Sequence, residues 1–424
     1  MLNRLGLNPG EDDPRLFKAL STVRDPADWL VQGLGISREE ARLRWQAATD
    51  PEPRYELRAQ IPQAVALACH DGPMLLTPGD AELTPLLPGY FFDATVIAWS
   101  PDGQRLMLSI TPRLAIVDFT ADELIWVPDS HGFTFPGSFE FFAPGPKWLS
   151  STTIAYLGGN FIPPANPSVW RFFDVTDPQR HWPELSGIGN YRPSPDRTLA
   201  ATSTTTDTEQ IELMPLFGGS AIPLGRGQFP LWSPDSRTLV YASAPDVLTT
   251  ADRNTLAVNE ILSASALTPS ESDAPINFLL PIAWSPDAKQ IAFIAAAAPR
   301  ESADQPARPK IWVGRVNADG ARPRRLQTVD NGYPLVARFS TDGQYFAVNV
   351  YQEFSAYGGV LIFKADTGAL LQSVTGLTFA DWSPTGHQLL LNAPEGVHLW
   401  REPDRPLEKL TDAQCFDARW NPAK

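Results

Sequence analysis

Five aspartates share the same local sequence, and by residue type they look like a constellation of carboxylates. Each follows a serine by two residues, and in four cases a proline stands between them: Asp102, Asp196, Asp235, Asp287 and Asp342. Serine, proline and aspartate in this order are typical of a type I turn, in which the aspartate side chain accepts hydrogen bonds from nearby backbone N–H groups. We therefore expect these carboxylates to stabilise turns and not to form a catalytic or metal site.

The histidines do not show the close spacing of a metal-binding motif. The chain has five, namely His70, His131, His181, His387 and His398. None forms an H-E-x-x-H pair or a similar spacing. Ligands could still meet from separate repeats, but His387 directly follows a turn glycine and is expected to be solvated. We predict no metal site and no cofactor.

Three glycine pairs begin like a dinucleotide-binding fingerprint. They are Gly33-x-Gly35, Gly187-x-Gly189 and Gly225-x-Gly227. Each lacks the third glycine and the strand–helix setting that the fingerprint requires. We expect all three to lie in loops.

A tetrapeptide repeat shows which elements must position these residues. Trp-Ser-Pro-Asp begins at Trp99, Trp232 and Trp284, and partial copies begin at Pro193, Phe339, Trp382 and Trp420, with a disguised copy at Trp148. A period of about 40–50 residues indicates a solenoid or a propeller. Short strands follow each turn, for example 106–110, 113–119, 310–316 and 323–328, and four strands per repeat are typical of a propeller blade. The prediction is an all-β, eight-bladed β-propeller over 61–424, with seven blades as the alternative.

Closure of the ring follows from the incomplete last repeat. Only four residues follow Trp420, whereas the strands predicted at 64–69, 73–77 and 82–87 lack a first strand. We infer that the last strand completes the first blade, which makes Cys69 and Cys415 cross-strand neighbours. These are the only two cysteines, and they are expected either as reduced core thiols or as a disulfide.

The repeated turn followed by a hydrophobic strand resembles the TolB-type, WD-repeat-like (PD-repeat) propeller of bacteria. The resemblance covers 61–424 and implies an interaction platform, an exported assembly factor or the gating domain of a serine peptidase. It transfers no catalytic residue. A peptidase would also need a Gly-x-Ser-x-Gly elbow, and the nearest approach, at 218–222, lacks the second glycine.

Composition argues against nucleic-acid and membrane partners. The net charge of −14 disfavours binding to a phosphate backbone. The longest apolar run, Ile291–Pro299, is too short to cross a bilayer, and the first fifteen residues lack a secretory signal, so a cytoplasmic protein is expected. Residues 1–60 are predicted to form a separate segment of three helices. A DNA-reading role for them is not expected, because Glu39 and Glu40 open the third helix.

Departures from the repeat supply the candidate contact residues. Aromatic side chains gather in and after one long connection, either as a partner-binding patch or as packing between blades: Phe133, Phe135, Phe139, Phe141, Phe142, Phe161 and Trp170. Residues just before the tryptophan position of the repeat form either a mostly basic channel mouth or ion pairs between blades: Lys147, Arg192, Arg338, Asp381 and Arg419. The polar stretch 244–272 is expected to be a mobile loop.

Taken together, the sequence favours a non-enzymatic scaffold that binds an unknown protein partner. One alternative is a small-molecule-binding or metal-dependent propeller enzyme that uses the axial channel. The other is a TolB-like exported factor, which would require a leader peptide.

Overall fold

A computed structural model describes most of the repeat region of this protein. The described residues are 37–38, 65–69, 72–77, 83–86, 94–110, 113–128, 130, 145–158, 169–204, 209–267, 275–297, 310–329, 332–351 and 358–422. The helices predicted within residues 1–60 lie outside these ranges, apart from Ser37 and Arg38.

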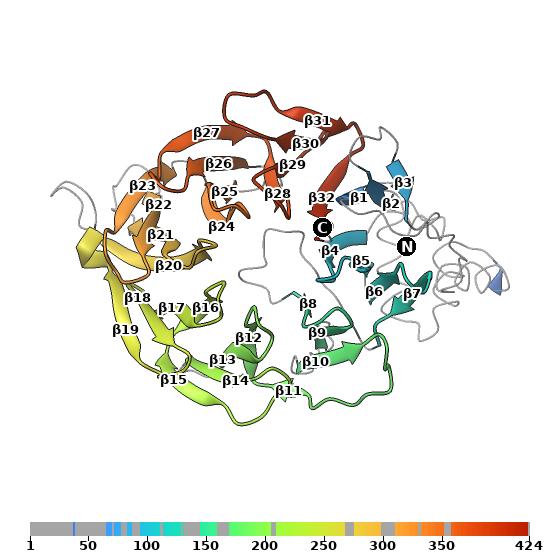
Figure 1. Cartoon of the computed structure of the whole chain (residues 1–424), viewed down its shortest axis with the longest axis horizontal. Coiled ribbons are helices and arrows are strands. Elements are labelled where there is room, and N and C mark those ends of the chain that lie inside the picture. Colours follow the sequence, from blue (N-terminus) through green and yellow to red (C-terminus); the bar gives the residue numbers. More distant parts are fainter. Residues whose placement is uncertain are drawn as a thin grey trace.

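The described residues form eight four-stranded antiparallel sheets arranged as blades around a ring (Figure 1). Blade 1 contains β32 (Cys415–Trp420), β1 (Val65–Cys69), β2 (Gly72–Leu76) and β3 (Leu83–Pro85). Blade 2 contains β4 (Ala94–Trp99), β5 (Arg105–Ile110), β6 (Arg113–Asp118) and β7 (Glu123–Trp126). Blade 3 contains β8 (Lys147–Trp148), β9 (Thr153–Gly158), β10 (Val169–Asp174) and β11 (Leu185–Ser186). Blade 4 contains β12 (Ile188–Pro193), β13 (Leu199–Thr204), β14 (Gln210–Pro215) and β15 (Ile222–Arg226).

The remaining blades continue in the same order. Blade 5 contains β16 (Gln228–Trp232), β17 (Thr238–Ala244), β18 (Val247–Asp252) and β19 (Val258–Ser263), followed by the 3-10 helix η2 (Ala264–Leu267). Blade 6 contains β20 (Ile276–Trp284), β21 (Gln290–Ala297), β22 (Lys310–Asn317) and β23 (Arg324–Val329). Blade 7 contains β24 (Tyr333–Phe339), β25 (Tyr345–Tyr351), β26 (Gly359–Lys364) and β27 (Leu370–Thr375). Blade 8 contains β28 (Thr378–Trp382), β29 (Leu389–Ala393), β30 (Gly396–Trp400) and β31 (Glu408–Thr411). The prediction of eight blades is confirmed, and the seven-bladed alternative is wrong.

The core of the protein lies between blades. Eight clusters of buried hydrophobic residues each join two neighbouring blades, so every seam of the ring has its own core. Repeated tryptophans reinforce the seams through their indole N–H groups. Trp99, Trp148, Trp232, Trp284 and Trp382 each donate to a backbone carbonyl of the preceding blade, at 2.9–3.2 Å. All five of these tryptophans are buried, so they belong to the core between blades.

The turn aspartates also behave as predicted. In each of the five Ser-x-Asp turns, the serine hydroxyl donates to the aspartate carboxylate at 2.6–2.7 Å. The same carboxylate oxygen accepts the backbone N–H two residues later, at 3.0–3.2 Å. These carboxylates therefore complete their own turns.

The two ends of the described repeat region share one sheet, as the closure hypothesis requires. β32 pairs with β1 from Val65↔Trp420 to Cys69↔Cys415 (Figure 1). The two cysteines are joined by a disulfide, with their Cα atoms 3.8 Å apart. Cys69 and Cys415 are thus cross-strand neighbours, as predicted. The sequence left open reduced thiols or a disulfide, and the structure has the disulfide.

The polar stretch 244–272 is not a projecting loop, and this expectation was wrong. Most of it forms the two outer strands of blade 5, β18 and β19, and η2. Thr249 and Thr250 are buried in β18, and the Thr249 hydroxyl lies 2.6 Å from the hydroxyl of Ser243 on β17. Threonine combines a polar group with high strand propensity, so a polar composition does not identify a loop here. Residues 268–272 lie outside the described ranges.

Candidate binding face and pocket

The antiparallel blades give the ring two different faces. The connection from first to second strand and that from third to fourth lie on one face, which we call the turn face because it carries the Ser-x-Asp turns. The other connections lie on the opposite face, which we call the loop face. First-to-second connections have four to six residues, whereas loop-face connections range from one residue to twenty. Variable connections on a rigid scaffold are where binding residues usually lie.

The predicted aromatic patch falls mostly in two loop-face connections. One connection spans the twenty residues between β7 and β8, and another spans ten residues between β9 and β10. Phe133, Phe135, Phe139, Phe141, Phe142 and Phe161 fall in these connections and lie outside the described residues. Trp170 is described. It is fully buried on β10, with its ring 5.1 Å from that of Tyr191 in blade 4. Trp170 therefore packs between blades and is not part of an exposed patch.

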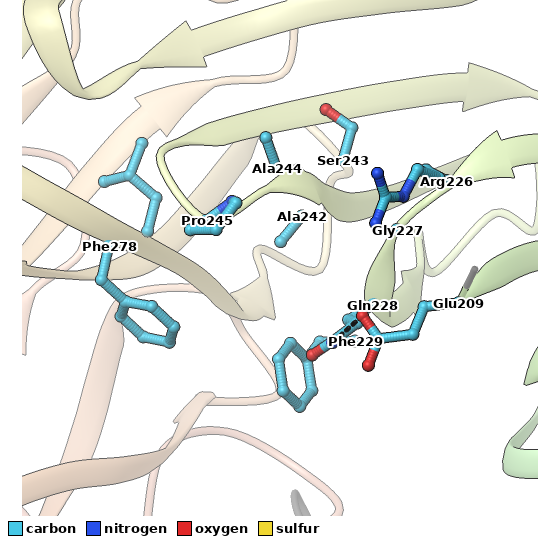
Figure 2. Close-up of a pocket in the computed structure, with 11 residues that line it drawn as sticks. Glu209, Arg226, Gly227, Gln228, Phe229, Ala242, Ser243, Ala244, Pro245 and Phe278 are labelled. Carbon is cyan, nitrogen blue, oxygen red and sulfur yellow. Dashed lines mark hydrogen bonds between the residues drawn. The ribbon is translucent and has the colours of Figure 1, made fainter. Parts of the chain in front are cut away.

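A pocket of about 440 Å³ opens on the loop face, where blades 4, 5 and 6 meet. Its lining comes from three places: the β15–β16 junction with the neighbouring Glu209, the β17–β18 hairpin, and the start of β20. Figure 2 shows the rings of Phe229 and Phe278 toward one side of the pocket and the side chains of Arg226 and Glu209 toward the other. Phe278 is 36% exposed, which is unusual for a phenylalanine on an inner strand.

Backbone geometry distinguishes this pocket from the rest of the described chain. Eight described residues other than glycine have positive φ, and six of them lie in turn-face connections. The other two, Glu209 (φ 41°) and Phe229 (φ 56°), both line the pocket. Left-handed backbone is costly for such residues and gathers at functional sites.

The walls of the pocket are held by backbone contacts. A Cβ at Gly227 would lie 2.5 Å from the Tyr241 ring and 2.8 Å from the Ala242 carbonyl oxygen, so the junction can approach β17 only because this residue is glycine. The Gly227 N–H donates to the Glu209 carbonyl at 2.8 Å, and the Leu279 N–H donates to the Pro245 carbonyl at 2.6 Å. The second bond ties the blade 5 hairpin to blade 6.

Of the two charged side chains that line the pocket, the Glu209 carboxylate has a hydrogen-bond partner within the lining and the Arg226 guanidinium has no carboxylate partner among the described residues. The Gln228 side-chain amide donates to the Glu209 carboxylate, which is the dashed bond in Figure 2. The Arg226 side chain is exposed, and no carboxylate among the described residues forms an ion pair with it. The site therefore combines an apolar end with a guanidinium group available to an anionic ligand.

Sequence reasoning missed this pocket. Gly225-x-Gly227 was expected to lie in a loop, but Gly225 and Arg226 end β15 and only Gly227 forms the β15–β16 junction. The expectation also fails for Gly189, which lies in β12. Nothing in the sequence around Gly227 indicates that it borders a cavity. Phe278 is the third residue of β20, and the residues that follow it, Leu279 and Leu280, are also apolar. The pocket depends on three blades meeting, which no local pattern encodes.

The predicted channel-mouth residues form contacts between blades where the structure describes their partners. Arg338 and Asp381 form an ion pair of 3.6 Å between blades 7 and 8. Arg419 is 7% exposed and donates to the Ala380 carbonyl at 3.0 Å, and Asp381 accepts the Trp420 N–H at 3.1 Å. Lys147 and Arg192 are half-buried. Arg338 and Asp381 thus form an ion pair between blades, which was one of the two alternatives predicted, whereas Arg419 contacts blade 8 through a backbone carbonyl.

The structure contradicts the expectation that His387 is solvated. His387 is not freely solvated: its Nδ1 lies 2.7 Å from the Asp342 carboxylate of blade 7, and its ring packs 4.9 Å from that of Tyr345. His181 is exposed and His398 is half-buried, while His70 and His131 lie outside the described residues. In the described part of the chain, no three histidine, cysteine or acidic side chains gather as metal ligands would. The helices of the described part include none that is long and apolar enough to span a bilayer.

Comparison with known proteins identifies the fold. No protein-family model matches the chain, and no curated protein sequence matches it significantly. Among solved structures, dihydro-heme d1 dehydrogenase NirN has a TM-score of 0.56 at 13% identity, covering 89% of this chain and 78% of that one. The tricorn protease has a TM-score of 0.47 at 10% identity, covering 80% of this chain. A TolB from Agrobacterium tumefaciens has a TM-score of 0.34 at 14% identity, covering 84% of this chain and 91% of that one.

These likenesses are of architecture. This chain spans 38% of the length of the tricorn protease chain. At such low identities the likeness carries no substrate or partner from one protein to another. The chain is a β-propeller, and its likeness to NirN agrees with the eight blades described above.

Proposed function

We propose that this propeller is an interaction module that binds a protein partner through its loop face. The observation that carries the proposal is the contrast between the faces. Turn-face connections largely satisfy their own polar groups, while the loop face has the most variable connections and a pocket with a half-exposed aromatic lining. Exposed aromatic side chains beside a cavity are typical of protein-binding surfaces.

A site-specific photo-cross-linker tests which face meets the partner. Blade 6 offers a matched pair of positions, because Phe278 lies at the loop-face end of β20 and Lys289 is exposed in the turn that follows β20. A benzophenone amino acid at either position forms a covalent bond to a protein that lies close to it. Because both positions belong to blade 6, a difference in cross-linking reports which face the partner contacts. We expect a discrete cross-linked partner, identified by mass spectrometry, from position 278 and none from position 289.

The reverse pattern, with cross-links only from position 289, would contradict the proposal. Equal labelling from both positions would also contradict it, because it would indicate non-specific contact. Thermal melting of both variants confirms that each blade remains folded before the comparison is made.

A further inference from the structure

We infer that the pocket between blades 4, 5 and 6 receives one aromatic side chain of the partner, flanked in the partner's sequence by an acidic residue. This inference rests on the proposed function and names the chemistry that one part of the loop face recognises. It concerns an extended protein segment as the occupant.

The apolar end of the pocket sets the first requirement. Phe229 and Phe278 present their rings, and Pro245, Ala242 and Leu279 complete the apolar lining (Figure 2). A volume of about 440 Å³ accommodates one large side chain with the backbone on either side of it. An aromatic group between two phenyl rings gains both buried area and favourable ring geometry. A single large apolar side chain is therefore the group that this end selects.

The charged end sets the second requirement. Several other described arginines already face a carboxylate, as Arg105 does with Asp118 and Arg253 does with Asp196. Arg226 has no such partner among the described residues, although the protein as a whole carries a net charge of −14. Glu209, the acidic residue of the lining, is hydrogen-bonded by the Gln228 amide. An acidic side chain next to the bound aromatic group would complete the pairing.

The pocket is also held in place before any partner arrives. The bond from Leu279 to Pro245 fixes one wall, and the close approach of Gly227 to Tyr241 fixes another. Phe229, which lines the pocket, has left-handed backbone with φ 56°. A site that is already formed loses less conformational entropy on binding, so a short peptide is a suitable probe.

Fluorescence anisotropy with short blocked peptides provides the test. The probe has the sequence Gly-Ser-Asp-Phe-Asp-Ser-Gly and carries a fluorophore, and its matched relatives replace Phe by Ala or both Asp by Asn. We expect the Phe-to-Ala peptide to bind about thirtyfold more weakly. We expect the Asn peptide to bind about fivefold more weakly to the wild-type protein.

Protein variants then assign these effects to the pocket. In Arg226→Gln the Asp and Asn peptides should bind equally well, because the charge that distinguishes them is gone. The matched control is Arg324→Gln, which removes an exposed arginine of blade 6 outside the pocket lining and should leave the fivefold difference unchanged. Ala244→Leu fills the pocket mouth and should abolish binding of every peptide, with thermal melting confirming that the variant is folded.

Three outcomes would overturn the inference. The first is no measurable binding of the Asp-Phe-Asp peptide at millimolar concentration. The second is an Arg226→Gln variant that still distinguishes Asp from Asn. The third is free 3-phenylpropionate competing as well as the peptide, which would make the pocket a small-molecule site. Failure of the peptides combined with a cross-link from position 278 would remove this inference and leave the proposed function standing.

Discussion

The turn face and the loop face are built from the same strands, but they treat their polar groups in opposite ways. On the turn face, Ser233 donates to Asp235, and the carboxylate of Asp235 caps the backbone N–H of Arg237. Left-handed residues there occupy the ends of repeated turns. On the loop face, the left-handed residues Glu209 and Phe229 surround a cavity, and Arg226 remains without an ion pair among the described residues. The repeated turns therefore stabilise the turn face, and the loop face is where we propose that a partner binds.

The largest expected effect concerns the disulfide, which joins β1 and β32 at the loop-face end of blade 1. Replacing both Cys69 and Cys415 by serine should lower the free energy of unfolding by about 4 kcal/mol, because the bond joins residues separated by 346 positions. Urea unfolding measures the loss. Wild-type protein treated with dithiothreitol under denaturing conditions and refolded should match the double variant, and an unchanged midpoint would contradict the prediction.

The same pair tests the expected compartment. Disulfides persist in oxidising compartments and are rare in the cytosol. Alkylation of thiols in lysates of the native host, followed by mass spectrometry, reads out the state of Cys69 and Cys415. Alkylated thiols would agree with the cytoplasmic expectation, and a bonded pair would oppose it.

The next largest effect tests whether the pocket junction depends on a close approach. Gly227→Ala should cost about 3 kcal/mol of stability, since its Cβ would meet the Tyr241 ring and the Ala242 carbonyl. Gly225→Ala is the matched control, because that glycine also has positive φ but a Cβ added to it would meet no atom within 4 Å. Thermal or urea unfolding should show a clearly smaller loss for Gly225→Ala, and equal losses would mean that the strained backbone alone decides both.

On the turn face the expected effects are smaller, because each turn is one of several copies. Asp235→Ala removes the acceptor of the Ser233 hydroxyl and of the Arg237 N–H, and should cost about 1 kcal/mol. Urea unfolding at pH 7 measures this. Asp235→Asn keeps an acceptor oxygen and should recover part of the loss; if both variants are as stable as the wild type, the turn bonds do not contribute.

The pH dependence of stability sharpens the same point. The hydrogen bond from the Ser233 hydroxyl holds the pKa of Asp235 below its ordinary value of 3.8. Burial alone would raise the pKa of Asp287 and Asp342, but the hydrogen bonds to their carboxylates outweigh it and lower the pKa of both. Because the folded pKa values are depressed, this stabilisation is complete above the unfolded pKa and is lost as the pH falls through the folded values. Wild-type stability should therefore decline below about pH 4, and Asp235→Asn should decline less steeply.

The smallest expected effect is a gain. Ala288 ends the blade 6 turn with φ 58°, whereas Gly343 occupies the same position in blade 7 with φ 71°. Ala288→Gly should raise the free energy of unfolding by about 0.5 kcal/mol, because glycine has no steric penalty in this region. The reciprocal Gly343→Ala should lower it through the backbone alone, since its Cβ would make only ordinary contacts, 3.6 Å from Pro286. Changes of the same sign in both variants would contradict this reasoning.

Several parts of the structure could be predicted because they depend on local chemistry repeated many times. The Ser-Pro-Asp turn, the tryptophan at the end of each first strand and the hydrophobic second strand each require only a few adjacent residues. The predicted strand 106–110 lies within β5, and the predicted strand 310–316 lies within β22. Even the pairing of Cys69 with Cys415 followed from counting strands, since an incomplete last blade requires a partner at the other end.

Other parts required the assembled ring. The polar composition around Thr249 and Thr250 predicted a loop. In the structure both residues lie in β18, which pairs with β17 on one side and β19 on the other. The sequence allowed Arg338 and Asp381 to line a channel mouth. In the structure they lie on neighbouring blades and form an ion pair of 3.6 Å.

The amino-acid sequence by itself therefore determined the repeat, the number of blades and the closure of the ring, because turns and strand patterns are short-range. The position of the candidate pocket required the tertiary structure, because Arg226 lies in blade 4, Phe229 in blade 5 and Phe278 in blade 6. Side chains so far apart in sequence converge through blade packing, and no local signal records that convergence.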